Sequence, residues 1–227
     1  MTAAAAAADD VRDPSLPGRL LAAERDALLP LLRSLPDADF ALPTAACPGW
    51  TVRDVLAHCS AALARVVESR FEKGVFSPES NERDIAERAE WTNARILDEL
   101  EHGMTEAGAV LAGRADGAWD GIAFGEWVHA GDVRDCLGEP GAYTGEGRPY
   151  ALTLLSRVTR DRGRPRLQAD LDDVDDPLHL GVPSGTRTPA RFIGDTATLV
   201  RLYTGRAVDG VSYELTGAEA GELNLYG

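Results

Sequence analysis

Cysteine is scarce in this sequence. Its 227 residues include three cysteines, Cys47, Cys59 and Cys136, an odd number without the spacing of a disulfide framework or a zinc ribbon. A disulfide-stabilised scaffold is therefore excluded, and a reducing, cytoplasmic setting is expected. Long apolar runs are also missing. Nowhere do about 18 apolar residues follow one another, which is the length that a membrane-spanning helix needs.

Positive charge is scarce as well. The chain has 23 Lys and Arg against 37 Asp and Glu, a formal net charge of −14, and its basic residues form no run or stripe. Contacts with phosphate groups require local positive charge, so neither nucleic acids nor membranes are expected as partners. The alanine run of residues 2–8 follows no positive segment, and we expect a disordered tail over 1–15 rather than a signal peptide.

Apolar residues recur at helical spacing in the first part of the chain, which predicts amphipathic helices. Four long helices joined by loops are typical of an antiparallel bundle. Pro30 lies inside the first helix and is expected to kink or split it. The helices are expected over residues 16–35, 52–73, 81–111 and 122–137.

The pattern changes after Gly138, where loop residues precede a further helix over 150–161 and then short β-like runs. Asp195 and Gly205 are typical of the two ends of a helix over 196–203. The expected fold is therefore mostly α, with a helical bundle over 16–163 followed by a small α+β domain over 164–227. Its strands are expected at residues 166–171, 192–193, 212–216 and 222–226.

The second helix has an unusually well-marked start. Pro48-Gly49 is typical of a turn, and Thr51 with Asp54 three residues later forms a capping-box pattern. These signals fix the helix register, and the register places His58 at the edge of the apolar stripe. The pattern does not by itself give His58 a function.

The fourth helix carries the most informative pair, because Glu126 and His129 fall among its apolar residues. A buried carboxylate is costly unless it is paired or binds a metal, and Glu-x-x-His is the ligand spacing of metal sites in helical bundles. With His58 the pair would give two histidines and one glutamate, the ligand number of a catalytic zinc site. The alternatives are a buried His–Glu hydrogen bond or an ion pair between Glu126 and an arginine.

Asp132 follows His129 by three residues and lies at the flank of the same helix face. It could orient a metal-binding histidine. Equally, it could form a salt bridge with Arg134 or Arg53.

Three segments resemble one known family. Residues 47–58, Cys-Pro-Gly-Trp-Thr-Val-Arg-Asp-Val-Leu-Ala-His, closely resemble the N-terminal signature of the mycothiol-dependent maleylpyruvate isomerase family, which is DinB-like. Residues 127–132, Trp-Val-His-Ala-Gly-Asp, resemble its second motif. Residues 192–206, which end in Tyr-Thr-Gly-Arg, and Glu-Leu-Thr-Gly at 214–217 resemble its sterol-carrier-like C-terminal lobe. The likeness covers nearly the whole chain after about residue 16.

The resemblance implies a DinB-like four-helix bundle with a small lobe, a divalent metal, usually zinc, and mycothiol as the thiol cosubstrate. His58 and His129 match the family's ligands directly. The family's glutamate stands four residues before the second histidine, where this chain has Gly125, so Glu126 is the nearest candidate for the third ligand.

The same resemblance implies that Arg206 holds an anionic group of the substrate. We assign Arg206 and Asp132 as candidate catalytic residues, and Trp50 and Arg53 as candidate cofactor-binding residues. The implied partners are a small electrophile and a low-molecular-weight thiol, and we expect a monomer or a weak homodimer.

Several functions fit these implications. The first hypothesis is a metal- and mycothiol-dependent S-transferase or cis–trans isomerase, since a metal-bound thiol becomes the nucleophilic thiolate. The second is a non-catalytic member that binds a metabolite or a protein, and Gly125 at the usual ligand position favours it. The third is a DinB-like metal hydrolase that uses water in place of the thiol.

Overall fold

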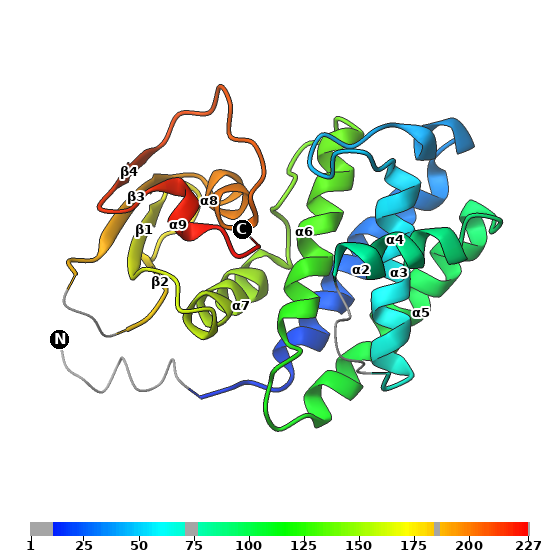
Figure 1. The fold of residues 1–227 in the computed structure, drawn as a ribbon, viewed down its shortest axis with the longest axis horizontal. Coiled ribbons are helices and arrows are strands. Elements are labelled where there is room, and N and C mark those ends of the chain that lie inside the picture. The colour runs from blue at the N-terminus through cyan, green and yellow to red at the C-terminus, as the bar shows by residue number, and fades with distance from the viewer. Residues whose placement is uncertain (1–10, 71–76, 184–186, 227) are drawn as a thin grey trace.

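The structure is a computed structural model that describes residues 11–70, 77–183 and 187–226. Figure 1 shows a bundle of helices on one side and a sheet with its own helices on the other, with α6 of the bundle facing the sheet domain. The predicted fold class, a four-helix bundle followed by a small α+β domain, is confirmed. None of the described helices has the length and apolarity needed to cross a bilayer.

Four long helices form the bundle, and the apolar face of each packs into a common core. The helix α2 runs without a break through Pro30, which lies on an exposed face, so the split considered for this position does not occur. The carbonyl left without its donor is that of exposed Asp26, where solvent can reach it. The four are α2 (Leu16–Ser34), α3 (Val52–Val67), α5 (Asn93–Gly113) and α6 (Gly121–Cys136).

The prediction of one helix over 81–111 is wrong. The chain forms α4 (Pro78–Glu87), a short connection and α5. Thr92, which the periodicity placed on an apolar face, instead caps α5, and its hydroxyl accepts a hydrogen bond from the Arg95 amide at 3.2 Å. The second helix also ends earlier than the predicted residue 73, because α3 ends at Val67 with Glu68 as its C-cap. Gly74, the predicted terminating residue, lies outside the described residues.

The C-terminal part contains a four-stranded sheet with the strand order β2-β1-β3-β4. The central strands β1 (Leu167–Leu171) and β3 (Ala190–Gly194) are parallel, and β2 (Leu178–Leu180) and β4 (Glu214–Thr216) flank them in antiparallel orientation. Helix α8 (Thr196–Thr204) is capped by Asp195 and ends at left-handed Gly205, as predicted. Two strand predictions are wrong: β2 was missed, and residues 222–226 carry the end of a short helix, α9 (Ala220–Leu223).

The two parts meet along α6 and α7 (Arg148–Asp161). The predicted domain boundary at residue 164 falls between α7 and β1 and stays a prediction. Tyr143, in the loop that joins α6 to α7, is fully buried at this junction, with its ring 6.1 Å from that of Trp127. The functional residues discussed below lie on this side of the bundle.

Replacement by alanine is expected to change the free energy of unfolding in opposite directions at two glycines of α6. A Cβ at Gly131 would overlap the Tyr143 ring, whereas a Cβ at Gly125 meets nothing within 4 Å. Gly131→Ala should therefore lower the free energy of unfolding by about 1–3 kcal/mol, as overpacking does. Gly125→Ala should raise it by up to about 1 kcal/mol through helix propensity. Urea denaturation of both variants checks this, and changes of the same sign would contradict the packing described here.

Candidate functional site

The start of α3 has the predicted capping box. The Thr51 hydroxyl accepts from the Asp54 amide at 3.2 Å, and the Asp54 carboxylate accepts from the Thr51 amide at 2.9 Å. The capping box determines the residue at which the helix begins. The side chains that follow therefore point in the directions set by that helix register. His58, two turns further on, is 8% exposed and faces α6.

A cavity of about 850 Å³ lies where α3, α4 and α6 meet the C-terminal lobe. Apolar walls come from residues such as Trp119 and Ile122, while the lobe contributes Tyr226. All three predicted metal ligands line this cavity, as do two of the other predicted site residues, Trp50 and Arg206. The side chains of the wall that can bind a ligand or react include those of Cys47, Trp50, His58, Glu126, His129 and Arg206.

The two predicted histidine ligands face each other across the bundle. The ring centroids of His58 and His129 are 5.4 Å apart, and the ring planes stand at 86°. Burial is the main cause that lowers the pKa of His58 to about 3, and the neighbouring Arg65 and Arg88 act in the same direction. His58 is therefore a neutral imidazole at neutral pH, the form that binds a metal.

Glu126 is 4% exposed, and its Oε2 is buried without a hydrogen-bond partner among the described residues. Burial raises the pKa of Glu126 to about 8, although a contact with Cys59 opposes the shift. No arginine pairs with this carboxylate within the described chain, so the ion-pair alternative for Glu126 finds no support. A buried carboxylate in this condition lacks a compensating positive charge.

Asp132 is the most heavily bonded carboxylate of the site. Its Oδ1 accepts from the Tyr143 hydroxyl at 2.6 Å and from Arg206 Nε at 3.0 Å. Its Oδ2 accepts from Arg206 Nη2 at 2.6 Å and lies 3.0 Å from His129 Nδ1. Although burial alone would raise it, the bonds to His129 and Arg206 hold the pKa of Asp132 well below its usual range.

The ionised Asp132 fixes the tautomer of His129. An acceptor at Nδ1 places the ring proton there, so we assign Nε2 as the free nitrogen, which is the usual state of a metal-binding histidine. The arginine partners considered for Asp132 from the sequence are not the ones found: Arg134 pairs with Glu24, and Arg53 bonds elsewhere. Arg206, 74 residues away in the chain, takes that place.

Arg53 does not line the cavity. Its guanidinium donates to the carbonyls of Arg88, Ala89 and Trp91 and to the side chain of Asn93. These bonds tie α3 to the connection between α4 and α5, so Arg53 has a structural position, and cofactor binding by Arg53 stays a prediction. Trp50 does line the cavity, with its ring centroid 5.3 Å from that of His58 and its Nε1 donating to Glu82 at 2.9 Å.

Cys47, His129 and Asp132 form the one group within the described ranges whose potential ligand atoms all lie within 4.8 Å of one another. We interpret it as a hydrogen-bond network rather than a metal centre. The oxygens of Asp132 are already occupied, and burial, together with Asp132, raises the pKa of Cys47 to about 12, which disfavours the thiolate that binds metals. Cys47 and Tyr143 were not expected at the site, because neither belongs to a periodic pattern.

The donor set of His58, Glu126 and His129 does fit a divalent metal. Two neutral imidazoles and a carboxylate are ligands that zinc accepts, and Glu126 Oε2 is buried with no partner within the described chain. Asp132 supplies the outer support that a ligating His129 requires. The ligand atoms of these three residues do not form a preassembled group within 4.8 Å, so binding requires side-chain adjustment.

Comparison with known proteins gives one family and one fold. The model of the mycothiol maleylpyruvate isomerase N-terminal domain matches residues 21–137, just over half of the chain. A crystal structure of the mycothiol-dependent maleylpyruvate isomerase superposes with a TM-score of 0.55 at 18% identity, covering 92% of this chain and 95% of that one. A second crystal structure, of a mutant of that enzyme with a histidine replaced by alanine, gives a TM-score of 0.54. No curated protein sequence matches the chain.

The buried state of Glu126 predicts a pH dependence for the metal-free protein. Its pKa is about 8 in the folded chain and 4.5 in the reference state, so between these values the folded state binds more protons. Stability contributed by this group is present below pH 4.5 and is lost as the pH rises toward 8. Thermal melting at a series of pH values should show Glu126→Gln gaining stability over wild type as pH rises. Exposed Glu106→Gln should run parallel to wild type, and a parallel Glu126→Gln curve would contradict the pKa shift.

Proposed function

Because the chain belongs to the mycothiol maleylpyruvate isomerase family, we propose that it is a mycothiol-dependent enzyme whose metal is held by His58, Glu126 and His129. The substrate is a small electrophile, and the chemistry is cis–trans isomerisation of the maleylpyruvate type or S-transfer. The observation that carries the proposal is the pair of facing histidines beside a buried carboxylate without a partner, all on the wall of one cavity.

A metal bound there would make a coordinated thiol deprotonate and so supply a thiolate, which is the nucleophilic form. In an isomerase the thiolate of the cosubstrate adds to one carbon of a double bond, the remaining single bond rotates, and the thiolate leaves. In a transferase the adduct is released. Both courses need an electrophile held beside the thiol and shielded from water, and the apolar walls of the cavity supply that shielding.

Different residues of the site orient the metal ligand, bind the substrate and contact the thiol. Asp132 holds the proton on His129 Nδ1 and keeps that ring in place. Arg206 uses Nε and Nη2 on Asp132 and Nη1 on the Thr204 carbonyl, which leaves two of the five guanidinium N–H donors for an oxygen in the cavity. Trp50 covers His58 and offers an apolar face to the bound thiol.

A second candidate function is a non-catalytic member of the family, and Gly125 favours it. This residue stands where the family has its glutamate, and it adjoins open space in the cavity wall. Glu126, one residue later, points from a position about 100° further around the helix. Loss of the carboxylate from its usual position would be expected in a protein that retains the fold to bind a metabolite or a protein partner.

Thiol selectivity separates these functions. Zinc-loaded protein should melt at a higher temperature with mycothiol and not with glutathione; a ligand at 100 times its Kd adds about 2.7 kcal/mol. It should also isomerise or conjugate maleylpyruvate only in the presence of mycothiol. His58→Ala, measured in parallel, should lose both responses.

Equal responses to the two thiols would contradict the proposed cosubstrate. A response to neither would favour the binding protein, and turnover without any thiol would favour the metal hydrolase.

A further inference from the structure

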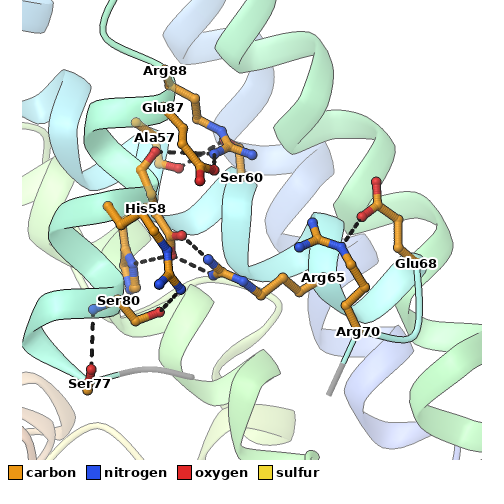
Figure 2. Close-up of polar contacts among 12 residues, drawn as sticks. Ala57, His58, Ser60, Arg65, Glu68, Arg70, Ser77, Ser80, Glu87 and Arg88 are labelled. Carbon is orange, nitrogen blue, oxygen red and sulfur yellow. Dashed lines mark hydrogen bonds and ion pairs between the residues drawn. The ribbon is translucent and has the colours of Figure 1, made fainter. Parts of the chain in front are cut away.

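A second buried carboxylate lies behind His58. Asp84 of α4 is 0% exposed, and its Oδ2 is 4.0 Å from His58 Nδ1. Arg65 of α3 grips both carboxylate oxygens, with Nη1 at 2.5 Å from Oδ2 and Nη2 bonded to Oδ1. Figure 2 shows the Arg65 side chain directed toward His58, and Arg88 beside Ser60.

The cluster continues beyond this pair. Arg88, at the end of α4, donates to the Ser60 hydroxyl at 3.1 Å, to Glu99 of α5 at 2.6 Å and to the Asp84 carbonyl at 3.2 Å. These hydrogen bonds and ion pairs thus connect the short helix α4 to both α3 and α5. Buried ion pairs give little net stability compared with apolar packing, so the cluster calls for an explanation other than stability alone.

We propose that Asp84 is the positioning residue of His58: it accepts the Nδ1 proton and thereby presents Nε2 to the cavity. This inference rests on the proposed function. His58 Nδ1 is buried and has no hydrogen-bond partner within the described chain, and Asp84 Oδ2 lies 4.0 Å from it. The present 4.0 Å is longer than a hydrogen bond, so the ring must move slightly toward Asp84 when Nε2 takes a ligand.

The arrangement at His129 supports this role by its likeness. There Asp132 lies against Nδ1 at 3.0 Å and is gripped by Arg206 at both oxygens. At His58, Asp84 occupies the corresponding position and is gripped by Arg65. Behind each histidine lies a carboxylate whose two oxygens are both bonded by an arginine, which suits a carboxylate that orients a ligand rather than binding the metal.

The two supports depend on different parts of the fold. The arginine that bonds Asp132, behind His129, belongs to the C-terminal lobe, whereas Asp84, behind His58, belongs to α4. The docking of the lobe and the docking of α4 therefore each determine the direction of one histidine. Helix α4 contributes to the site without providing a ligand.

The ¹⁵N and ¹H resonances of the histidine rings in zinc-loaded wild-type protein test this directly. The account predicts that His58 carries its proton on Nδ1 and binds zinc through Nε2, as His129 does. A His58 ring with its proton on Nε2 would overturn the proposal. This measurement uses the unaltered chain and does not depend on whether a variant folds.

Two variants test the same point by affinity. Asp84→Asn should lower zinc affinity by about 10–100-fold, the usual effect of losing such a support, and should shift the His58 Nδ1 proton resonance. Glu99→Gln breaks the Arg88 ion pair in the same cluster without touching His58, so it should change neither. Affinity is measured by competition with a chelator, below the melting temperature of each variant.

Equal zinc affinity in Asp84→Asn and wild type, or equal losses in both variants, would overturn the positioning role alone. Wild-type protein that binds no zinc would overturn the proposed function first, and this inference with it.

Discussion

The carboxylate of Asp132 is the interaction on which the rest of this site depends. It is 1% exposed and receives bonds from three separate segments: His129 one turn earlier in α6, Tyr143 in the loop before α7, and Arg206 in the C-terminal lobe. Such a buried charge is tolerated because the guanidinium of Arg206 neutralises it and every oxygen is occupied. One carboxylate therefore both joins the lobe to the bundle and fixes the ring of a candidate ligand.

The contact between Asp132 and Arg206, which holds the C-terminal lobe against the bundle, also determines where the cavity lies. The bundle supplies His58, Glu126 and His129, and the lobe closes the space above them with Arg206 and its C-terminal segment. A bundle alone would leave these side chains open to water, where a thiolate and an electrophile would be poorly protected. The family relationship accounts for the histidines, while the bonds of Asp132 account for how they are held.

Local signals in the sequence were sufficient for the elements that carry the ligands. The capping box of Thr51 and Asp54 gave the start of α3, and the apolar pattern with Gly138 gave both ends of α6 to within one residue. The predicted helix or strand was wrong where two local sequence patterns favoured different structures. Thr92 fits a helical apolar stripe and is also a good cap, and the second property determines the structure. At residues 222–226 a strand was expected, but a capping box at Glu219 and Glu222 forms a short helix there.

The pairing of each supporting carboxylate with its arginine, behind His129 and behind His58, could not be predicted from local sequence patterns. Arg206 reaches Asp132 across 74 residues, and Asp84 meets Arg65 only because α4 packs on α3. Such pairings depend on how helices and the lobe pack against one another, and neither the periodicity nor the residue spacing of the sequence predicts them. Asp132 was expected as a supporting residue, but neither Arg134 nor Arg53, the two arginines considered for it, is its partner, because the docking of the C-terminal lobe brings Arg206 there instead.

The central claim is that His58, Glu126 and His129 together hold the metal. A crystal of the zinc-loaded protein, measured on both sides of the zinc absorption edge, tests it most directly. The account predicts one anomalous difference peak in the cavity, in contact with these three side chains and with no sulfur of the protein. A peak bonded to Cys47 and Asp132, or a cavity without a peak, would contradict it.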